Sequence, residues 1–282
     1  MKILVPLDGS PKSESVLPLV GRLAQHWEAE VLALRVLDPT MGAADPFVLA
    51  LSESAYQRML DEAREYLEDM VKRHPELSLH TLHQVGAPAF CIEEVARKQD
   101  CNLIVMATHG HSGLLRWLWG SVAEGVARHA PCPSLLVRSP ETPVLFREIM
   151  IPTDGSEPSL NVARHIGRFI RPETKVTLLH CSGAGEQHLE EARQSLGQHV
   201  DGRPWMRLEC VSADAPPGIF DWLSQHDCDL IAMSTHGRDG LAHLWTGSLM
   251  EEVARQSNCP VLVFPPGTLN SESNEEVAHA NL

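Results

Sequence analysis

Residues 107–122 read ATHGHSGLLRWLWGSV, and residues 234–249 read STHGRDGLAHLWTGSL. In both copies an apolar run ends in a Thr-His-Gly turn, nine residues follow, and a Gly-Ser pair comes next. An apolar run that ends in glycine is typical of a buried strand followed by a turn. A Gly-Ser pair is typical of the start of a helix. The stretch therefore predicts a strand, a loop and a helix, and the chain contains this arrangement twice.

The sequence before and after the first copy alternates between short apolar runs and amphipathic stretches with helical spacing. The apolar runs predict strands at residues 3–7, 31–37, 77–85, 103–107 and 133–137. The amphipathic stretches predict helices at residues 13–27, 52–73, 88–99 and 120–129. Strands that alternate with helices in this way predict an α/β fold with a mostly parallel, doubly wound sheet.

The pattern then starts again. EIMIPTDGS at residues 148–156 repeats KILVPLDGS at residues 2–10, an offset of 146, whereas the glycine stretches are offset by 127. The offset shrinks because the second copy lacks most of the loop and helix start that the first copy has at residues 38–57. We therefore expect one domain over residues 1–140, a second over residues 146–266, and a disordered polar tail over residues 267–282.

Composition excludes several classes of function. The chain has 282 residues, of which 43% are hydrophobic, and a formal net charge of −14. An acidic surface repels phosphate backbones, so we expect no general nucleic-acid binding and no attachment to membranes. No apolar stretch is long enough to predict a membrane span or a signal peptide. Seven cysteines without a CxxC pair predict reduced thiols and a cytoplasmic location.

The repeated stretch follows the carboxyl end of a predicted strand, which is where open α/β sheets bind their ligands. The free N–H groups of a helix that starts at Gly120 and Ser121 would suit a phosphate. Asp8, after the first strand, could accept hydrogen bonds from an adenine amine or a ribose hydroxyl, and Val36 would form an apolar wall. A second interpretation needs no ligand, because the glycines could simply form a turn and Asp8 could cap its own turn.

On these residues the sequence resembles the universal stress protein family in its tandem form. The family motif is G-x-x-G, nine residues, and then G-[ST]. The first copy aligns Ala107 to Gly110 and then Gly120-Ser121 with this motif, and the second aligns Ser234 to Gly237 and then Gly247-Ser248. VPLDGS, NLIVMATHG and GSVAEGVARHAPCPSLLV match as well, as do IPTDGS, DLIAMSTHG and GSLMEEVARQSNCPVLVF. The resemblance covers nearly the whole chain apart from the tail.

The resemblance implies two tandem Rossmann-like domains, each with a five-stranded parallel sheet of order 3-2-1-4-5. It also implies that ATP binds together with Mg²⁺. In the first half the implied site consists of Pro6, Leu7, Asp8, Val36, Ala107, Gly110, His111, Gly113, Gly120, Ser121 and Val122. The positions that match it in the second half are Asp154, Cys181, Gly237, Arg238, Gly240, Gly247, Ser248 and Leu249.

The sequence departs from the family pattern in two respects. Ala107 and Ser234 replace the first motif glycine, and only the first half keeps a G-x-P at residues 86–88. We therefore expect the first site to be the stronger one. The recurring histidines and tryptophans favour structural roles, and no ligand cluster predicts a bound metal. The recurring cysteines at 101, 132, 228 and 259 favour core packing, with redox sensing as the alternative.

No set of residues forms a catalytic constellation. The resemblance therefore implies a nucleotide-dependent sensor or regulator of the stress response. Two alternatives remain: a nucleotide-free interaction module, and a slow ATP hydrolase of the adenine-nucleotide hydrolase group. The last strand of each half is apolar, and family members commonly pair through it. We therefore expect an intramolecular pseudo-dimer, a homodimer built on it, and a protein partner that the sequence does not name.

Overall fold

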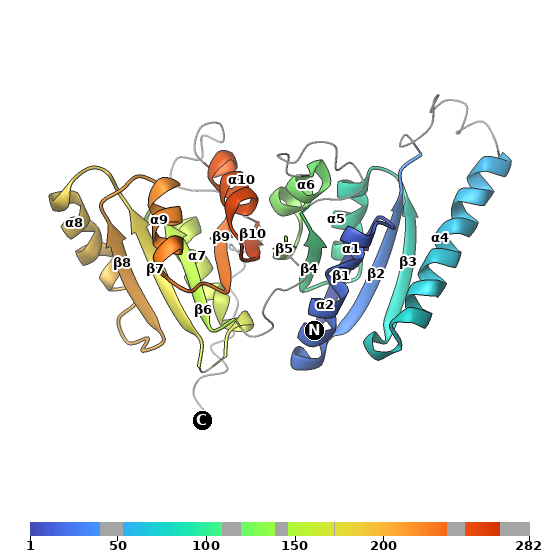
Figure 1. The fold of residues 1–282 in the computed structure, drawn as a ribbon, viewed down its shortest axis with the longest axis horizontal. Coiled ribbons are helices and arrows are strands. Elements are labelled where there is room, and N and C mark those ends of the chain that lie inside the picture. The colour runs from blue at the N-terminus through green and yellow to red at the C-terminus, as the bar shows by residue number, and fades with distance from the viewer. Residues whose placement is uncertain (40–52, 109–119, 139–145, 172, 236–245, 266–282) are drawn as a thin grey trace.

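A computed structural model describes residues 1–39, 53–108, 120–138, 146–171, 173–235 and 246–265. Ten strands form one continuous sheet of order β3-β2-β1-β4-β5-β10-β9-β6-β7-β8 (Figure 1). Within each half all pairs are parallel, and the order is third, second, first, fourth, fifth. The α/β fold and the strand order expected from the resemblance are confirmed.

The elements of the first half follow the predicted alternation. The strands are β1 (Lys2–Leu7), β2 (Glu30–Leu37), β3 (Leu79–Val85), β4 (Leu103–Ala107) and β5 (Ser134–Val137). The helices are α1 (Pro11–Glu14), α2 (Leu17–Trp27), α4 (Glu53–Arg73), α5 (Pro88–Lys98) and α6 (Ser121–His129), with a short 3-10 turn η1 (Pro75–Leu77).

The second half repeats this order of strands and helices. Its strands are β6 (Glu148–Thr153), β7 (Lys175–Cys181), β8 (Met206–Val211), β9 (Leu230–Ser234) and β10 (Val261–Phe264). Its helices are α7 (Glu157–His165), α8 (Glu186–Gly197), α9 (Pro217–Gln225) and α10 (Thr246–Gln256), with η2 (Ile166–Phe169) after α7. Between the second and third strands, α8 has 12 residues where α4 has 21, as the shrinking repeat offset predicted.

Two predicted elements of the first half need correction. The helix expected at residues 13–27 is two helices, because Pro18 lacks the N–H that would bond to the Glu14 carbonyl in a continuous helix. The strand expected from residue 77 starts at Leu79, after η1 and a left-handed Ser78 with φ of 45°. Apolar periodicity alone does not place such breaks.

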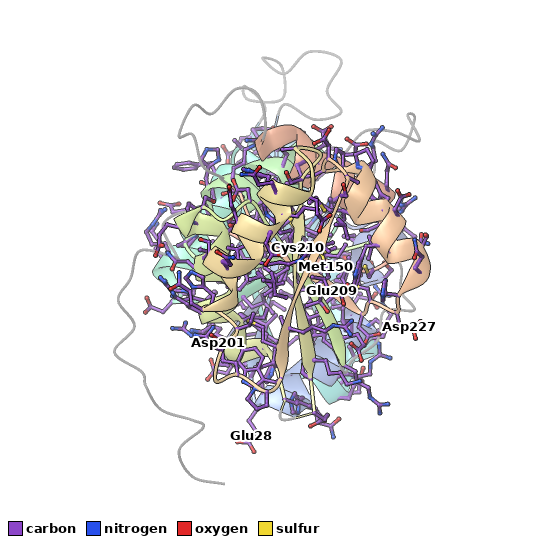
Figure 2. All side chains as sticks on the ribbon, turned by 90° about the vertical axis from the view of Figure 1, so that its left-hand side faces the viewer. Glu28, Met150, Asp201, Glu209, Cys210 and Asp227 are labelled. Carbon is purple, nitrogen blue, oxygen red and sulfur yellow. The ribbon has the colours of Figure 1, made fainter. Side chains whose placement is uncertain are left out.

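The two halves share their core. One apolar cluster lies on each face of the sheet, and each draws residues from both halves. The first is covered mainly by α2, α4, α7 and α8, and the second by α5, α6, α9 and α10. In an end-on view Met150 of β6 lies in the packed interior, whereas Asp201 and Asp227 lie at the periphery (Figure 2). Each half is therefore doubly wound, and the clusters continue across the junction between the halves.

The junction is an antiparallel pairing of the two last strands. Leu135 of β5 lies opposite Leu262 of β10, and Leu136 lies opposite Val261. Beside it, Phe169 packs edge-on against both Trp27 and Phe264, with ring centroids 5.8 and 6.0 Å apart. The expected pairing of the halves through their last strands is therefore present within the chain. Residues 139–145, where the domain boundary was predicted, and the predicted tail at 267–282 lie outside the described residues.

Candidate functional site

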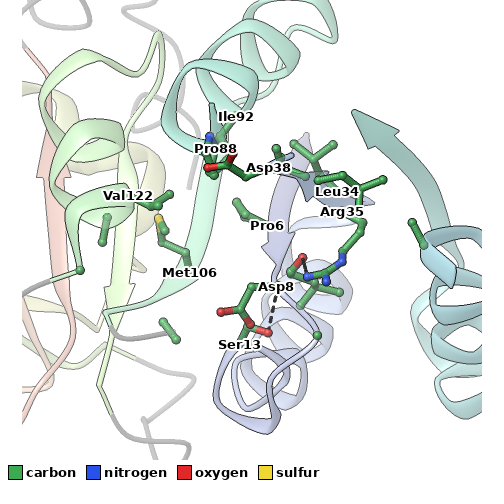
Figure 3. A pocket seen from close by; sticks show the side chains of 18 of the residues that line it. Pro6, Asp8, Ser13, Leu34, Arg35, Asp38, Pro88, Ile92, Met106 and Val122 are labelled. Atoms are coloured by element: carbon green, nitrogen blue, oxygen red, sulfur yellow. Dashed lines mark hydrogen bonds between the residues drawn. The ribbon is translucent and has the colours of Figure 1, made fainter. Parts of the chain in front are cut away.

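A pocket of about 740 Å³ opens at the carboxyl ends of β1, β2 and β4, beside the start of α6 (Figure 3). Its apolar lining includes Leu34, Val36, Ile92, Met106 and Val122, and its charged lining is Asp8, Arg35, Asp38 and Glu62. This is the edge at which doubly wound sheets bind ligands. The volume lies in the range of sites for small molecules and cofactors.

The pocket brings together every described residue that the sequence nominated in the first half. These residues are Pro6, Leu7, Asp8, Val36, Ala107, Gly120, Ser121 and Val122. Three further nominated residues, Gly110, His111 and Gly113, lie outside the described residues. The residues thus form one cavity, and their contact with a nucleotide stays a prediction.

Asp8 has a structural role within its own turn. Its Oδ1 accepts a hydrogen bond from the Ser10 N–H at 2.9 Å and another from the Ser10 hydroxyl at 2.6 Å. Gly9 between them has a φ of 81°, a left-handed conformation that favours glycine. Asp154 repeats the turn, because its Oδ1 accepts from the Ser156 N–H at 3.0 Å. Asp8 therefore caps its own turn, and in the first half this turn also lines the pocket, so the cap and a ligand contact do not exclude each other.

Gly120 joins the pocket to the N-terminus of α6. Its N–H donates to the Thr108 carbonyl at 3.2 Å, and a Cβ added to Gly120 would lie 3.3 Å from the same oxygen. The residue is the N-cap of α6, and no side chain caps the helix at this position. The first N–H groups of a helix have no partner within it and carry a partial positive charge. This corner of the pocket therefore suits an anionic group.

Arg35 and Tyr66 also line the pocket, and neither was predicted from the sequence. The Arg35 Nη1 donates to the Leu7 carbonyl at 3.2 Å, and its guanidinium lies 5.5 Å from the centre of the Tyr66 ring. Arg35 thus places a positive charge beside Asp8 (Figure 3). The one feature of the sequence that could have predicted Arg35 as a pocket residue is its position next to Val36, because residues at the carboxyl end of one strand share one edge of the sheet.

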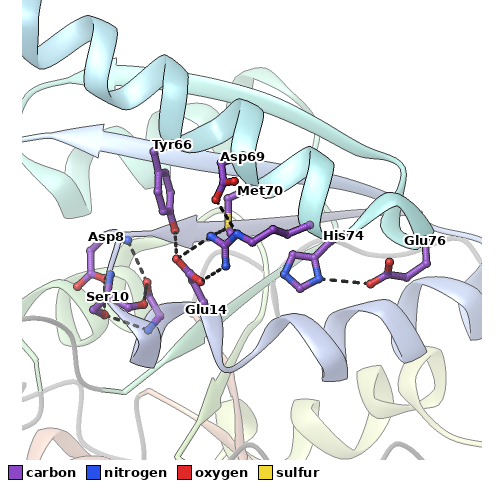
Figure 4. A network of polar contacts seen from close by, with 10 residues as sticks. Asp8, Ser10, Glu14, Tyr66, Asp69, Met70, His74 and Glu76 are labelled. Atoms are coloured by element: carbon purple, nitrogen blue, oxygen red, sulfur yellow. Dashed lines mark hydrogen bonds and ion pairs between the residues drawn. The ribbon is translucent and has the colours of Figure 1, made fainter.

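Tyr66 belongs to a polar network that ties α4 to α1 (Figure 4). Its hydroxyl donates to Glu14 at 2.9 Å, Arg73 Nη1 donates to the other Glu14 oxygen at 2.9 Å, and Arg73 Nε donates to Asp69 at 2.6 Å. Burial and the hydrogen bond to Glu14 raise the pKa of the Tyr66 phenol well above its usual range. The network holds the α4 wall of the pocket in place.

One face of α4 forms that wall. Met59, Glu62, Ala63 and Tyr66 line the pocket, and their spacing of three, one and three residues places them on a single helical face. The same stripe continues into the core with Leu67 and Met70. The sequence predicted an amphipathic helix here, but it contained no signal that the amino-terminal part of the stripe would meet a cavity.

The second half places different side chains at the matching positions. The sheet register aligns His180 with Arg35 and Cys181 with Val36. The imidazole Nδ1 of His180 lies 3.0 Å from the Thr153 carbonyl, as Arg35 lies beside the Leu7 carbonyl. Burial raises the pKa of Cys181 to about 12. The position that Ala87 occupies in the first half is occupied by Asp214, whose Oδ1 accepts from the Gly183 N–H at 3.0 Å.

The nominated residues of the second half are only partly described. Gly247, Ser248 and Leu249 lie in the first turn of α10, which begins one residue before the predicted Gly-Ser start. Gly237, Arg238 and Gly240 lie outside the described residues. Among the described residues, no group of three or more side chains suits a metal ion. In that same part of the chain, no helix is long and apolar enough to cross a membrane.

Fold and site together define a class: a tandem pair of doubly wound α/β domains with a ligand pocket at the carboxyl ends of the strands. The sequence model of the universal stress protein family matches residues 1–138 and 182–265. The chain belongs to the universal stress protein family.

Individual relatives agree with this assignment. A universal stress protein of Methanocaldococcus jannaschii is 37% identical over 146 residues, covering 50% of this chain and 83% of the relative. One from Methanothermobacter thermautotrophicus is 35% identical over 145 residues, covering 49% of this chain and 95% of the relative. The crystal structure of a universal stress protein from Archaeoglobus fulgidus covers 94% of this chain and 96% of its own, with a TM-score of 0.70. At 19% identity this last likeness concerns the fold alone.

Proposed function

We propose that the first half binds ATP together with Mg²⁺, and that the protein acts as a nucleotide-dependent regulator in the stress response. The observation that supports this proposal is a pocket that joins an apolar wall to a helix N-terminus at the carboxyl edge of the sheet. An adenine nucleotide needs both surfaces, because its base is flat and apolar and its phosphates are anionic.

In the proposed complex, each part of the nucleotide has its own set of lining residues. The base would lie against Leu34, Val36 and Ile92, and Asp8 would accept a hydrogen bond from the base or the ribose. The phosphates would lie at Gly120 and Ser121, and a side chain at position 120 would crowd the Thr108 carbonyl. Mg²⁺ would be held mainly by the phosphates, since the described residues offer no cage of carboxylates.

A weaker second site is proposed at Asp154, Cys181, Gly247, Ser248 and Leu249. Asp214 places a carboxylate beside the end of β7, where it would repel an anionic ligand. The two alternative functions, an interaction module and an ATP hydrolase, predict different results. An interaction module would keep its fold and bind no nucleotide, and a hydrolase would turn over ATP well above a slow background. The proposed homodimer would show a mass of two chains by light scattering.

Calorimetric titration of the nucleotide-stripped chain with Mg-ATP tests the proposal. We expect binding near one ATP per chain. Gly120→Val should weaken it by at least about tenfold, or about 1.4 kcal/mol, because its branched side chain meets the Thr108 carbonyl. The matched variant Gly247→Val should leave this binding unchanged. Binding near two per chain would mean that both sites are active, and no binding by the folded protein would leave the interaction module.

A further inference from the structure

Each half carries a pair of cysteines at the amino ends of its fourth and fifth strands, the edge of the sheet opposite the pocket. Cys101 and Cys132 each lie two residues before a strand of the first half, and Cys228 and Cys259 do so in the second. All four are free thiols. Since neighbouring parallel strands begin at one edge, both pairs are brought together by the fold.

The two pairs differ in their surroundings. Cys101 and Cys132 are buried, with 7% and 5% of their surface exposed, and burial raises their pKa values to about 11 and about 12. Cys228 and Cys259 are only partly buried, and their sulfur atoms are 4.0 Å apart and hydrogen-bonded. The first pair is thus buried like ordinary core thiols, whereas the residues of the second pair are partly exposed and their sulfur atoms are in contact.

The hydrogen bond between the second pair makes the two thiols unequal. It lowers the pKa of Cys259, because a thiolate there is stabilised by the neighbouring thiol, and it raises the pKa of Cys228. Burial of Cys259, and to a smaller extent the charge of Asp229, act against this lowering of the Cys259 pKa. A thiolate is the nucleophilic form of cysteine, so Cys259 would be the one to react first.

We propose that Cys228 and Cys259 are a redox modification site that forms a reversible intradomain disulfide with hydrogen peroxide or a similar hydroperoxide as oxidant. The Cys259 thiolate attacks one peroxide oxygen, and the other leaves as hydroxide, which takes up a proton to become water. The Cys228 sulfur then attacks the Cys259 sulfenic acid, and a second water leaves. Two thiols and one peroxide thus give one disulfide and two waters. The sulfurs must approach from 4.0 Å to about 2.0 Å.

The Cys228–Cys259 pair lies close to residues that join the two halves, so a disulfide there would affect the junction. The Ser257 hydroxyl donates to the Cys259 carbonyl at 3.0 Å. From the first half, Arg138 Nη1 donates to the carbonyls of Arg255 and Ser257 at 2.6 and 3.3 Å. These carbonyls lie at the end of α10, whose first turn carries Gly247 and Ser248. A disulfide would therefore tie the start of β9 to the segment that Arg138 contacts.

Differential alkylation and peptide mass spectrometry of the full-length protein test this proposal. After treatment with a small excess of hydrogen peroxide, we expect a peptide pair cross-linked through Cys228 and Cys259 that dithiothreitol separates again. The matched pair Cys101 and Cys132 should remain reduced and open to alkylation. We expect these two thiols to react with peroxide at least about tenfold more slowly than Cys228 and Cys259. Equal reactivity of the two pairs, or no cross-link between Cys228 and Cys259, would overturn the proposal.

Two variants assign the order of the steps and guard against misfolding. In Cys228→Ser the sulfenic acid on Cys259 has no partner, so a dimedone adduct should accumulate there. Cys101→Ser should keep the Cys228–Cys259 cross-link at the wild-type rate. Circular dichroism would confirm that both variants fold. A Cys228→Ser protein that folds but forms no adduct on Cys259 would contradict the proposed first step.

Discussion

At residue scale, Asp214 is the side chain that most clearly separates the two halves. Its carboxylate accepts from the Gly183 N–H, and a Cβ on Gly183 would lie 2.6 Å from Asp214 Oδ1. The first half has Ala87 at this position and Pro88 beside it in the pocket lining. The loop after the third strand therefore carries a carboxylate only in the second half, whereas the first half has a carboxylate, Asp38, after its second strand.

Replacing this carboxylate should improve nucleotide binding by the second half. In a Gly120→Val background, Asp214→Ala should tighten Mg-ATP binding by about tenfold, or about 1.4 kcal/mol, because it removes a charge of the same sign as the phosphates. Calorimetric titration measures the change. Asp221→Ala, an exposed carboxylate on α9, is the matched control. Equal affinities in the two variants would contradict the role given to Asp214.

Residues that repeat in both halves were the ones the sequence could predict. The Asp-Gly-Ser turns after β1 and β6 were recognised because they recur, and both form the expected local hydrogen bonds. Arg35 was missed because its counterpart is His180 and because its partners, Leu7 and Tyr66, lie far away in the sequence. Contacts of this kind depend on how strands and helices are placed in the sheet.

At the scale of elements, Tyr66 and Arg73 attach α4 to α1 through Glu14. Tyr66→Phe should lower the free energy of unfolding by about 1 kcal/mol, because it removes a half-buried hydrogen bond to a carboxylate. The melting temperature should fall by about 2–4 °C. ATP binding should weaken as well, because the wall of the pocket loses an anchor. Tyr56→Phe, on an exposed part of the same helix, is the control and should change neither quantity.

The pH dependence of this variant provides a second check. The raised pKa of Tyr66 means that its neutral phenol is favoured in the folded protein. Its contribution to stability is therefore complete below about pH 10, the usual tyrosine pKa, and is lost as the pH rises above it. Thermal unfolding between pH 8 and 11 should show a smaller alkaline loss of stability for Tyr66→Phe. Identical alkaline slopes in the two proteins would contradict this account.

Helices and strands were predicted correctly where the apolar periodicity is strong. Their boundaries were predicted wrongly where the conformation or the missing N–H of a single residue ends an element. The long helix at α4 and the buried strands follow from apolar spacing. The break between α1 and α2 depends on one missing N–H at Pro18, and the late start of β3 depends on Ser78 at positive φ. Which part of the α4 stripe would face a cavity and which would face the core depends on how far the helix extends beyond the sheet.

At the scale of the whole molecule, the pairing of β5 with β10 covers an apolar edge in each half. Residues 1–138 alone would expose the backbone groups of β5 beside Leu135, Leu136 and Val137. Because such an edge is a template for strand pairing, the fragment should form a homodimer. Light scattering measures its mass. Leu136→Lys in the fragment should shift it to the monomer, and a monomeric unmodified fragment would contradict the prediction.

A second contact between the halves should make stability depend on pH. Arg171 Nε donates to His26 Nε2 at 3.0 Å, and burial together with the Arg171 charge lowers the pKa of His26, while Glu173 opposes this effect. Stability from the neutral imidazole is therefore present above about pH 6.5 and is lost as the pH falls. The loss should stay below about 1 kcal/mol because the contact is exposed.

His26→Gln tests this contact in thermal unfolding between pH 8 and 5. The variant should lose less stability on acidification than the wild type, since glutamine does not titrate. His83→Gln, at an exposed position of β3, provides the control and should follow the wild-type curve. If His26→Gln loses as much stability between pH 8 and 5 as the wild type does, the contact between His26 and Arg171 is not a source of the pH dependence.

The sequence by itself determined the alternation of strands and helices, the duplication and the edge of the sheet at which a ligand would bind. Each of these depends on local periodicity, turn residues or a repeat, all of which are visible along the chain. Only the tertiary structure decided that α4 contributes Met59 and Tyr66 to the pocket, that Asp214 distinguishes the second half, and that Cys228 and Cys259 meet at 4.0 Å. Those contacts join residues far apart in sequence, and their distances arise from the packing of helices on a shared sheet.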